Sequence, residues 1–217
     1  LLLAGCAAAV ALLPPDSADR PQGLSLTYVE ESQRGTARLG ATPESERLPV
    51  AVAAAAPFEA AAEPLVPWAR RPRGFTASVA PLGLPAPGLE LLEEARVGAA
   101  RRLRLRVSSP RGAQALILSF PVSQAPSTVR MNGRQVELSL GQARRRGGSH
   151  VTYSCLTVPP EGLEVELELG SAPVELILAD RSLGLPAEWQ ALAAARPPDA
   201  VPIHEGDTTI VLRRVRL

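Results

Sequence analysis

Hydrophobic and charged residues alternate strictly in two segments of the chain. Residues 163–169 read LEVELEL, and residues 102–107 read RLRLRV. Because successive side chains of a strand point to opposite faces, each segment predicts a strand with an aliphatic face toward a core and a charged face toward water. If the two strands are neighbours, the arginine and glutamate rows face each other, and each cross-strand pair contributes about 0.2–1 kcal/mol.

Strand-like segments recur at short intervals along the rest of the chain, with turn residues between them. This spacing is typical of an all-β sandwich, and we predict an antiparallel, sandwich-like domain. The predicted strands cover residues 24–30, 36–39, 50–54, 75–80, 89–97, 102–107, 113–120, 128–131, 135–140, 150–158, 163–169, 174–178 and 208–216. Residues 57–74 are expected to form an Ala/Pro-rich connection. Residues 82–88 (LGLPAPG) are expected to form a loop and a weak subdomain boundary.

Asn132-Gly133 marks a tight turn between two strand-like segments. Both residues tolerate the positive φ angles of a type I′ turn, which joins antiparallel strands through two residues. The sequence therefore predicts a β-hairpin over residues 129–136.

One short helix is predicted near the C-terminus. Residues 187–196 (AEWQALAAAR) follow a proline and end at Pro197-Pro198, as expected for a helix with a proline at each boundary. Trp189 and Leu192 are three positions apart, so both can dock on the sheet from one face of this helix.

The chain begins with an uncharged apolar run, LLLAGCAAAVALL, closed by Pro14-Pro15. The run is shorter than the roughly 20 residues that cross a bilayer, but it starts without methionine. We therefore predict that residues 1–15 are the end of a truncated transmembrane helix. Two alternatives stay open: residues 3–6 (LAGC) match a lipobox that would acylate Cys6, and the run also fits a signal-peptide remnant.

Residues 16–22 are then a juxtamembrane linker, and residues 23–217 form the β domain. The linker starts DSADR and lacks the basic cluster that is common on cytoplasmic flanks. We therefore expect a bacterial membrane location, with the β domain facing the periplasm or the outside.

Composition narrows the choice of partners. The 217 residues are 46% hydrophobic but only 3% aromatic, so the core is expected to consist of Leu, Val and Ala. A net charge of +1 supplies no global field for nucleic acid, and no nucleic-acid partner is predicted. All basic residues are arginine, which together with abundant Ala, Pro and Gly indicates a GC-rich bacterial genome.

Residues capable of catalysis are sparse. His204-Glu205-Gly206-Asp207 gathers three potential metal ligands, yet a single loop holds an ion only loosely, so a polar turn is favoured. His150 is interpreted as a loop-edge histidine, and Cys155 as a small core hydrophobe. We predict no catalytic, cofactor-binding or metal-binding residue in this chain.

Two arginine clusters lie in predicted loops. Solvated loop charge is the favoured interpretation of both, and the functional alternative is contact with lipid headgroups or an acidic partner. The clusters are Arg144, Arg145 and Arg146 in one loop, and Arg70, Arg71 and Arg73 in the other.

Short phrases at both ends of the chain resemble a known family. They are residues 20–29 near the start and residues 179–186, 195–202, 206–211 and 213–217 at the end. The latter four resemble the extreme C-terminus of multi-spanning bacterial membrane zinc exopeptidases of peptidase family M-28, the aminopeptidase Y and endoplasmic-reticulum metallopeptidase group. Residues 20–29 resemble the first strand after that family's last membrane helix.

The resemblance implies a non-catalytic accessory domain. In that family a zinc-dependent peptidase domain precedes the membrane helices, and a β-rich extracytoplasmic domain follows them. The implied role is to cover or orient the peptidase domain or to bind partners. Zinc is expected only in that missing domain, and the implied partners are this domain and the membrane. Two rival hypotheses are a lipid-anchored periplasmic binding protein tethered through Cys6, and a self-contained hydrolase that uses His150 or His204.

Overall fold

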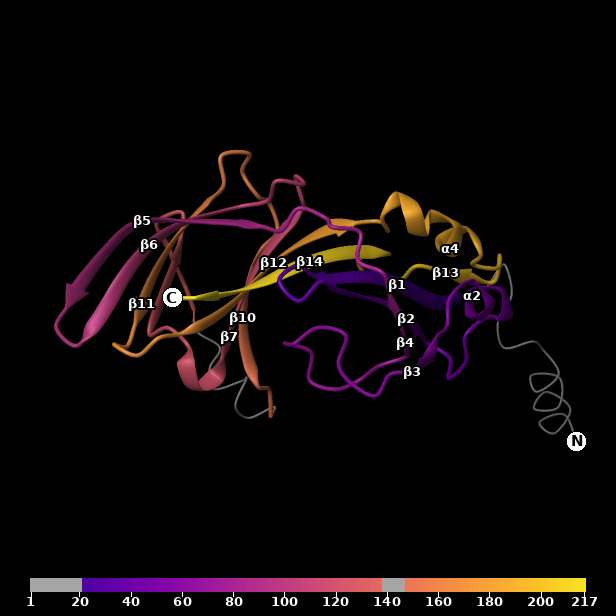
Figure 1. The fold of residues 1–217 in the computed structure, drawn as a ribbon. Coiled ribbons are helices and arrows are strands. Elements are labelled where there is room, and N and C mark those ends of the chain that lie inside the picture. Colours follow the sequence, from indigo (N-terminus) through magenta and orange to yellow (C-terminus); the bar gives the residue numbers. More distant parts are fainter. Residues whose placement is uncertain (1–20, 138–146) are drawn as a thin grey trace, which may run out of the picture.

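Two β-sheets form the body of the protein, which the computed structural model describes over residues 21–137 and 147–217 (Figure 1). The larger sheet contains β1 (Gln22–Glu31), β2 (Thr36–Pro43), β3 (Glu59–Ala60), β4 (Phe75–Val79), β7 (Ala115–Pro121), β10 (His150–Cys155), β12 (Glu175–Leu183), β13 (Ala200–Val201) and β14 (Thr208–Arg216). The smaller contains β5 (Gly88–Val97), β6 (Ala100–Ser108), β8 (Thr128–Met131), β9 (Arg134–Val136) and β11 (Leu163–Leu169).

The strand order of the larger sheet is β10-β7-β12-β14-β1-β2-β4-β3, and β13 pairs with the start of β1. The smaller sheet has the order β5-β6-β11-β8-β9. Pairing is antiparallel except where β1 lies parallel to β13 and β14. The predicted all-β, sandwich-like fold is confirmed, and the parallel pairing of β1 is an addition to it.

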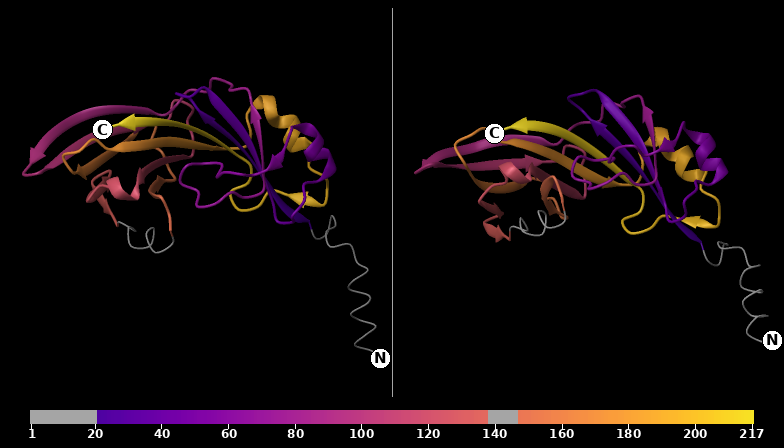
Figure 2. Two further views of the ribbon diagram at one scale, coloured as in Figure 1. Left: turned by 60° about the horizontal axis from the view of Figure 1, so that its bottom comes forward. Right: turned by 90° about the horizontal axis from the view of Figure 1, so that it is seen from below.

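The larger sheet is shared by three clusters of buried side chains. One lies between the smaller sheet and the β7, β10 and β12 end of the larger sheet, and a second lies under the helices at the β1, β2 and β4 end. β12 is buried on both faces, because Leu176 and Leu178 join the first cluster while Ile177 and Ala179 join the third. Figure 2 shows the two halves side by side along one elongated molecule.

The predicted charge ladder is confirmed. β6 and β11 are antiparallel neighbours, and the pairs Arg102–Glu168, Arg104–Glu166 and Arg106–Glu164 face each other in register. The ladder continues on both sides, since Arg106 Nη1 lies 3.1 Å from Glu90 of β5, and Arg130 of β8 lies 3.8 Å from Glu166. Glutamate and arginine columns therefore alternate across the outer face of the smaller sheet.

The predicted hairpin is also confirmed. Met131 pairs with Arg134 across a two-residue loop, and both loop residues have positive φ, 47° for Asn132 and 74° for Gly133. Asn132 adds a contact of its own, because its Oδ1 accepts a hydrogen bond from the Glu164 amide of β11 at 3.1 Å.

Helices cover the end of the larger sheet where β1 begins. The predicted C-terminal helix appears as the 3₁₀ turn η2 (Ala187–Trp189) followed by α4 (Gln190–Ala194), and Leu192 and Trp189 pack into the second cluster as expected. A further 3₁₀ turn, η1 (Val122–Gln124), follows β7.

The strand predicted over residues 50–54 is wrong. These residues form the helix α2 (Val50–Ala55). Alanine has the strongest helix propensity, and Val52 alone of the helix is buried, so the alanine-rich composition outweighs the short valine alternation.

Some sequence-based expectations concern residues beyond this description. The proposed membrane segment 1–15 and the residues 138–140 of one predicted strand lie outside the described residues. Within residues 21–137 and 147–217, no helix has the length and apolar character needed to cross a bilayer.

Candidate functional site

Two buried carboxylates, Glu30 and Asp180, and the partly buried Asp207 hold segments that connect the strands. Asp180 on β12 is completely buried; its Oδ1 accepts a 2.6 Å hydrogen bond from Arg111, and its Oδ2 accepts one of 2.5 Å from Ser109. Ser109 in turn accepts from the amide of Ala113 at 3.0 Å. Asp180 therefore fixes the loop by which the chain passes from β6 of the smaller sheet to β7 of the larger.

Glu30 on β1 holds the segment by which the chain passes from β4 of the larger sheet to β5 of the smaller sheet. It is 2% exposed, and its carboxylate accepts hydrogen bonds from the Tyr28 hydroxyl at 2.6 Å and from the amides of Leu82 and Leu84 at 3.0 and 3.1 Å. Burial and the hydrogen bond to Glu30 raise the pKa of Tyr28, so its hydroxyl remains a donor. The segment between β4 and β5 is thereby fastened to the larger sheet.

The turn that contains His204 is a polar connection, as predicted. Asp207 accepts two hydrogen bonds from Arg196, at 2.6 and 2.8 Å, and one from the Leu26 amide at 2.9 Å. Glu205 pairs with Arg181 at 2.9 Å, and His204 has a positive φ of 56°. These acids are engaged by arginine, and no group of three or more potential metal ligands occurs among the described residues.

His150 opens β10, where its Nδ1 lies 2.9 Å from the Ser149 hydroxyl. Burial, followed by the positive charge of Arg214, lowers the pKa of His150 below its usual 6.5, although Glu175 opposes this. Cys155, at the end of the same strand, is partly buried against the first core cluster, close to the expected core position.

The shifted pKa of His150 predicts a loss of stability in mild acid. The unfolded chain takes up a proton on this side chain at a pH where the folded chain does not, so the free energy of unfolding falls as the pH drops below about 6.5. Wild type should therefore lose stability relative to His150→Gln between about pH 7.5 and pH 5.5. Denaturant titrations of both proteins measure this difference, and a constant difference would contradict the prediction.

The remaining candidates from the sequence are placed as follows. Cys6, Arg144, Arg145 and Arg146 lie outside the described residues, so their proposed contacts stay predictions. Arg70, Arg71 and Arg73 surround a hollow of about 580 Å³ together with Trp68 and Gly147.

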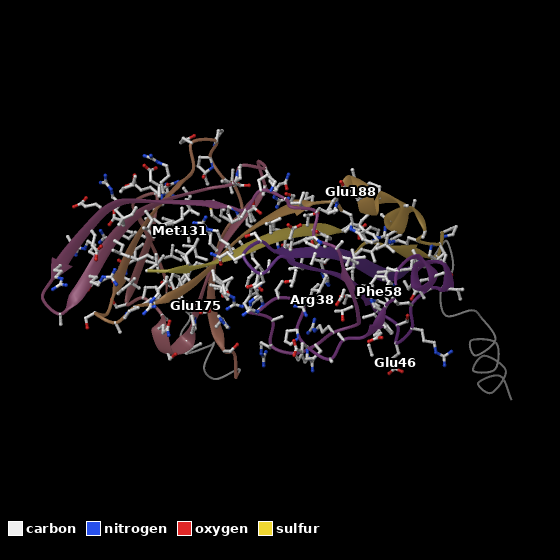
Figure 3. All side chains as sticks on the ribbon, in the orientation of Figure 1. Arg38, Glu46, Phe58, Met131, Glu175 and Glu188 are labelled. Atoms are coloured by element: carbon white, nitrogen blue, oxygen red, sulfur yellow. The ribbon has the colours of Figure 1, made fainter. Side chains whose placement is uncertain are left out.

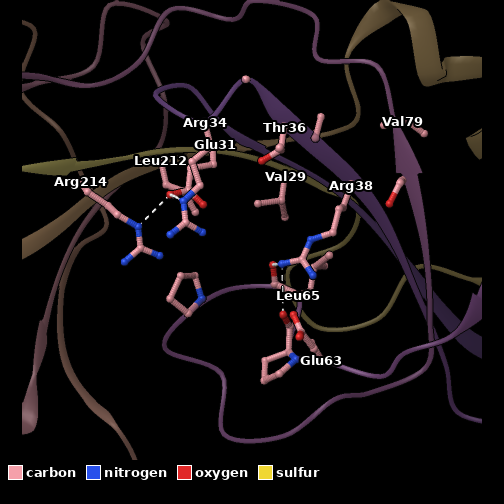
Figure 4. A pocket seen from close by; sticks show the side chains of 15 residues that line it. Val29, Glu31, Arg34, Thr36, Arg38, Glu63, Leu65, Val79, Leu212 and Arg214 are labelled. Carbon is pink, nitrogen blue, oxygen red and sulfur yellow. Dashed lines mark hydrogen bonds and ion pairs between the residues drawn. The ribbon is translucent and has the colours of Figure 1, made fainter.

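A second hollow, of about 570 Å³, contains two arginines of the β1–β2 hairpin and one of β14 (Figure 4). We call it the arginine pocket; it is formed by β1, β2, β14 and the loop of residues 63–67. Its arginines are Arg34 from the β1–β2 turn, Arg38 from β2 and Arg214 from β14, and its carboxylates are Glu31 and Glu63. In Figure 4 the three guanidinium groups point into the same space.

The three arginines differ in how far they are neutralised. Arg214 lies 2.8 Å from Glu31 and 2.7 Å from Glu175; burial disfavours its charge, but these hydrogen bonds and charges outweigh burial and raise its pKa. Arg34, which is 62% exposed, shares Glu31 at 3.3 Å. Arg38 forms no ion pair with any residue that the structure describes.

Arg38 is nevertheless held in place. Its Nη2 donates to the backbone carbonyls of Pro64 and Leu65 at 3.2 and 2.8 Å. Leu65 itself packs against Gly40 of β2, where any larger residue would collide with it. The Arg38 guanidinium is therefore oriented by the fold, while its Nε and Nη1 have no carboxylate partner among the described residues.

Sequence reasoning missed this pocket. Arg34, Arg38 and Arg214 carry no motif, and the last is almost 180 positions from the others, since only the parallel pairing of β1 with β14 brings it near them. The one sequence feature near the pocket is the polar turn at Arg34-Gly35, which precedes a strand. Such turns are too common to indicate a site.

Neither a scan against models of protein families nor a search of curated proteins finds a match to this chain.

Proposed function

We propose that this chain is a non-catalytic accessory domain, tethered to a bacterial membrane by its apolar start and facing the periplasm, that binds an acidic segment in the arginine pocket. The sequence resemblance makes the parent a membrane zinc exopeptidase of family M-28, with zinc in a domain outside this sequence. The acidic segment then belongs to the parent's peptidase domain or to a partner. The observation that supports binding is that two backbone carbonyls orient the Arg38 guanidinium, which has no carboxylate partner among residues 21–137 and 147–217.

The acids that hold connecting segments support a structural role for these polar groups rather than a catalytic one. Glu30, Asp180 and Asp207 are each saturated by hydrogen bonds that fasten a connecting segment. The oxygens of these carboxylates are occupied by donors of the protein itself, so they are not free to contact a substrate.

Carboxylate is the ligand chemistry that suits the pocket best. The planar guanidinium presents paired N–H donors that match the two oxygens of a carboxylate. Arg34 and Arg214 share Glu31, and Arg214 also pairs with Glu175, so an incoming carboxylate would pair with Arg38, which has no carboxylate partner among the described residues. Leu65, Val29 and Val79 supply apolar walls that lower the local dielectric and strengthen such a bond.

A binding titration tests this proposal. Full chain is titrated with a fluorescent tetra-glutamate peptide, and anisotropy reports the dissociation constant. Arg38→Ala should weaken binding by roughly 10- to 100-fold, because a charged hydrogen bond contributes about 1.5–3 kcal/mol. Arg38→Lys should recover little, since lysine lacks the paired donors. Arg34→Ala, which leaves the loop of residues 63–67 untouched, should weaken binding less.

Arg104→Ala is the matched control, because Arg104 is 47% exposed on the charge ladder at the other half of the molecule. Equal losses in Arg38→Ala and Arg104→Ala would show nonspecific attraction and would contradict the pocket. Lipid labelling that disappears in Cys6→Ser would instead favour the lipid-anchored binding protein. Hydrolysis of a peptide or ester that His150→Ala or His204→Ala abolishes would favour the self-contained hydrolase.

A further inference from the structure

One end of the molecule exposes an apolar helix. Every residue of α2 except Val52 is exposed, none is charged, and Val50 is 86% exposed. Val201 of β13, at the same end, is 38% exposed. We call these exposed residues, Val50, Ala51, Ala53, Ala54, Ala55 and Val201, the α2 patch.

The α2 patch lies where the chain enters the domain. Gln22, the first residue of β1, pairs with Ala200, and its amide donates to the Asp199 carbonyl at 2.8 Å. Gly23 pairs with Val201. Figures 1 and 2 show α2, α4 and β13 gathered at the end where β1 starts, and the β5–β6 hairpin at the opposite end.

From these positions we infer that the α2 patch rests on the lipid bilayer. The inference rests on the membrane tether of the proposed function. The linker from Pro15 to Gln22 reaches at most about 25 Å even when fully extended. A domain tethered there keeps this end, and not the β5–β6 hairpin, within reach of the membrane surface.

The contact is apolar rather than electrostatic. The described charged residues around this end are of both signs: Glu46 and Arg47 precede α2, Glu59 follows it, and Glu188 lies in η2. In the view of Figure 3, Glu188 lies toward the top of the molecule and Glu46 toward its bottom. Binding through anionic lipids requires a cluster of arginines or lysines, whereas an uncharged valine and alanine surface can only add a small apolar contact, whose strength scales with the apolar area buried.

A weakly binding surface is enough to orient the domain, because the tether supplies most of the membrane affinity. Six residues of alanine and valine would not hold a free domain on a membrane. Once the chain is anchored, the local concentration of lipid at the α2 patch is in the millimolar range or above, so even a slight preference fixes the orientation of the domain.

Site-directed fluorescence tests the inference on the full chain. Val50→Cys and Val97→Cys are made in a Cys6→Ala, Cys155→Ser background, labelled with a fluorophore and reconstituted into vesicles that contain a nitroxide headgroup lipid. Val97, which is 47% exposed at the end of β5, is the matched control at the far tip. We expect several-fold stronger quenching at position 50 than at position 97, equally in phosphatidylcholine and in phosphatidylethanolamine/phosphatidylglycerol vesicles.

The possible results distinguish a wrong tether from a wrong assignment of the α2 patch. If the labelled chain does not float with the vesicles, the peptide tether is wrong and the inference falls with it. If it floats but positions 50 and 97 are quenched alike, only the inference is wrong. Quenching at position 50 that requires phosphatidylglycerol would overturn the apolar contact. Shielding of position 50 from iodide without quenching by lipid would assign the patch to a protein.

Discussion

Asp180→Ala should lower the free energy of unfolding by about 3–5 kcal/mol. Asp180 is fully buried, and its removal leaves the Arg111 guanidinium, only 12% exposed, without its 2.6 Å partner. Ser109 loses its acceptor in the same step. An uncompensated buried charge is among the most destabilising changes in a folded protein. Guanidinium chloride titrations followed by circular dichroism measure the loss.

Glu166→Ala serves as the control for this prediction. Glu166 is 32% exposed and lies 3.8 Å from Arg130, so its loss should cost no more than about 1 kcal/mol. The double variant Asp180→Leu/Arg111→Leu should recover much of the lost stability, because removing both charges leaves neither one unpaired. If Asp180→Ala proves no more harmful than Glu166→Ala, the pair with Arg111 does not hold the β6–β7 loop.

Glu30→Ala should cost at least about 3 kcal/mol and release the connection between the two sheets, since a hydrogen bond to a charged group contributes about 1.5–3 kcal/mol. Three donors lose their acceptor together: the Tyr28 hydroxyl and the amides of Leu82 and Leu84. Hydrogen exchange followed by mass spectrometry should show faster exchange at Leu82 and Leu84 than elsewhere in the larger sheet.

Two further variants define the role of Glu30. Tyr28→Phe removes one donor and should cost about 1 kcal/mol. Glu93→Ala removes a carboxylate that is 63% exposed and 3.9 Å from Arg104, and it should leave both stability and exchange almost unchanged. Unchanged exchange at Leu82 and Leu84 in Glu30→Ala would mean that another contact holds this segment.

Sequence pattern predicted the local structure well where one face of a strand meets water. Alternation identified β6 and β11 and even their pairing, because opposite charges on neighbouring strands are a signal shared by both. It identified the Asn132-Gly133 turn because few residues tolerate positive φ. It was wrong at α2, where a run of small apolar residues fits a helix and a strand equally well and the packing of Val52 decides.

Neither the arginine pocket nor the hydrogen bonds of Glu30 and Asp180 to the connecting segments could be predicted from the sequence. Glu30 and Asp180 resemble any other acid along a strand, and their burial follows only from the crossing loops that pack over them. Arg34, Arg38 and Arg214 meet because β14 lies beside β1, a parallel pairing between the two ends of the chain that leaves no periodic trace. Non-local pairing, rather than local propensity, determines both features.

The parallel pairing of β1 with β14 also determines when the larger sheet can be completed during synthesis. β14 lies between β12 and β1 in the middle of the larger sheet, yet ribosomes make it after every other described strand. Nascent chains grow from the N-terminus at about 5–20 residues per second, so β1 waits roughly ten seconds or more for its neighbour. Until then the edges of β1 and β12 that face β14 remain unpaired. Unpaired strand edges can pair with other chains, so a chain cut short before residue 208 should be prone to aggregation.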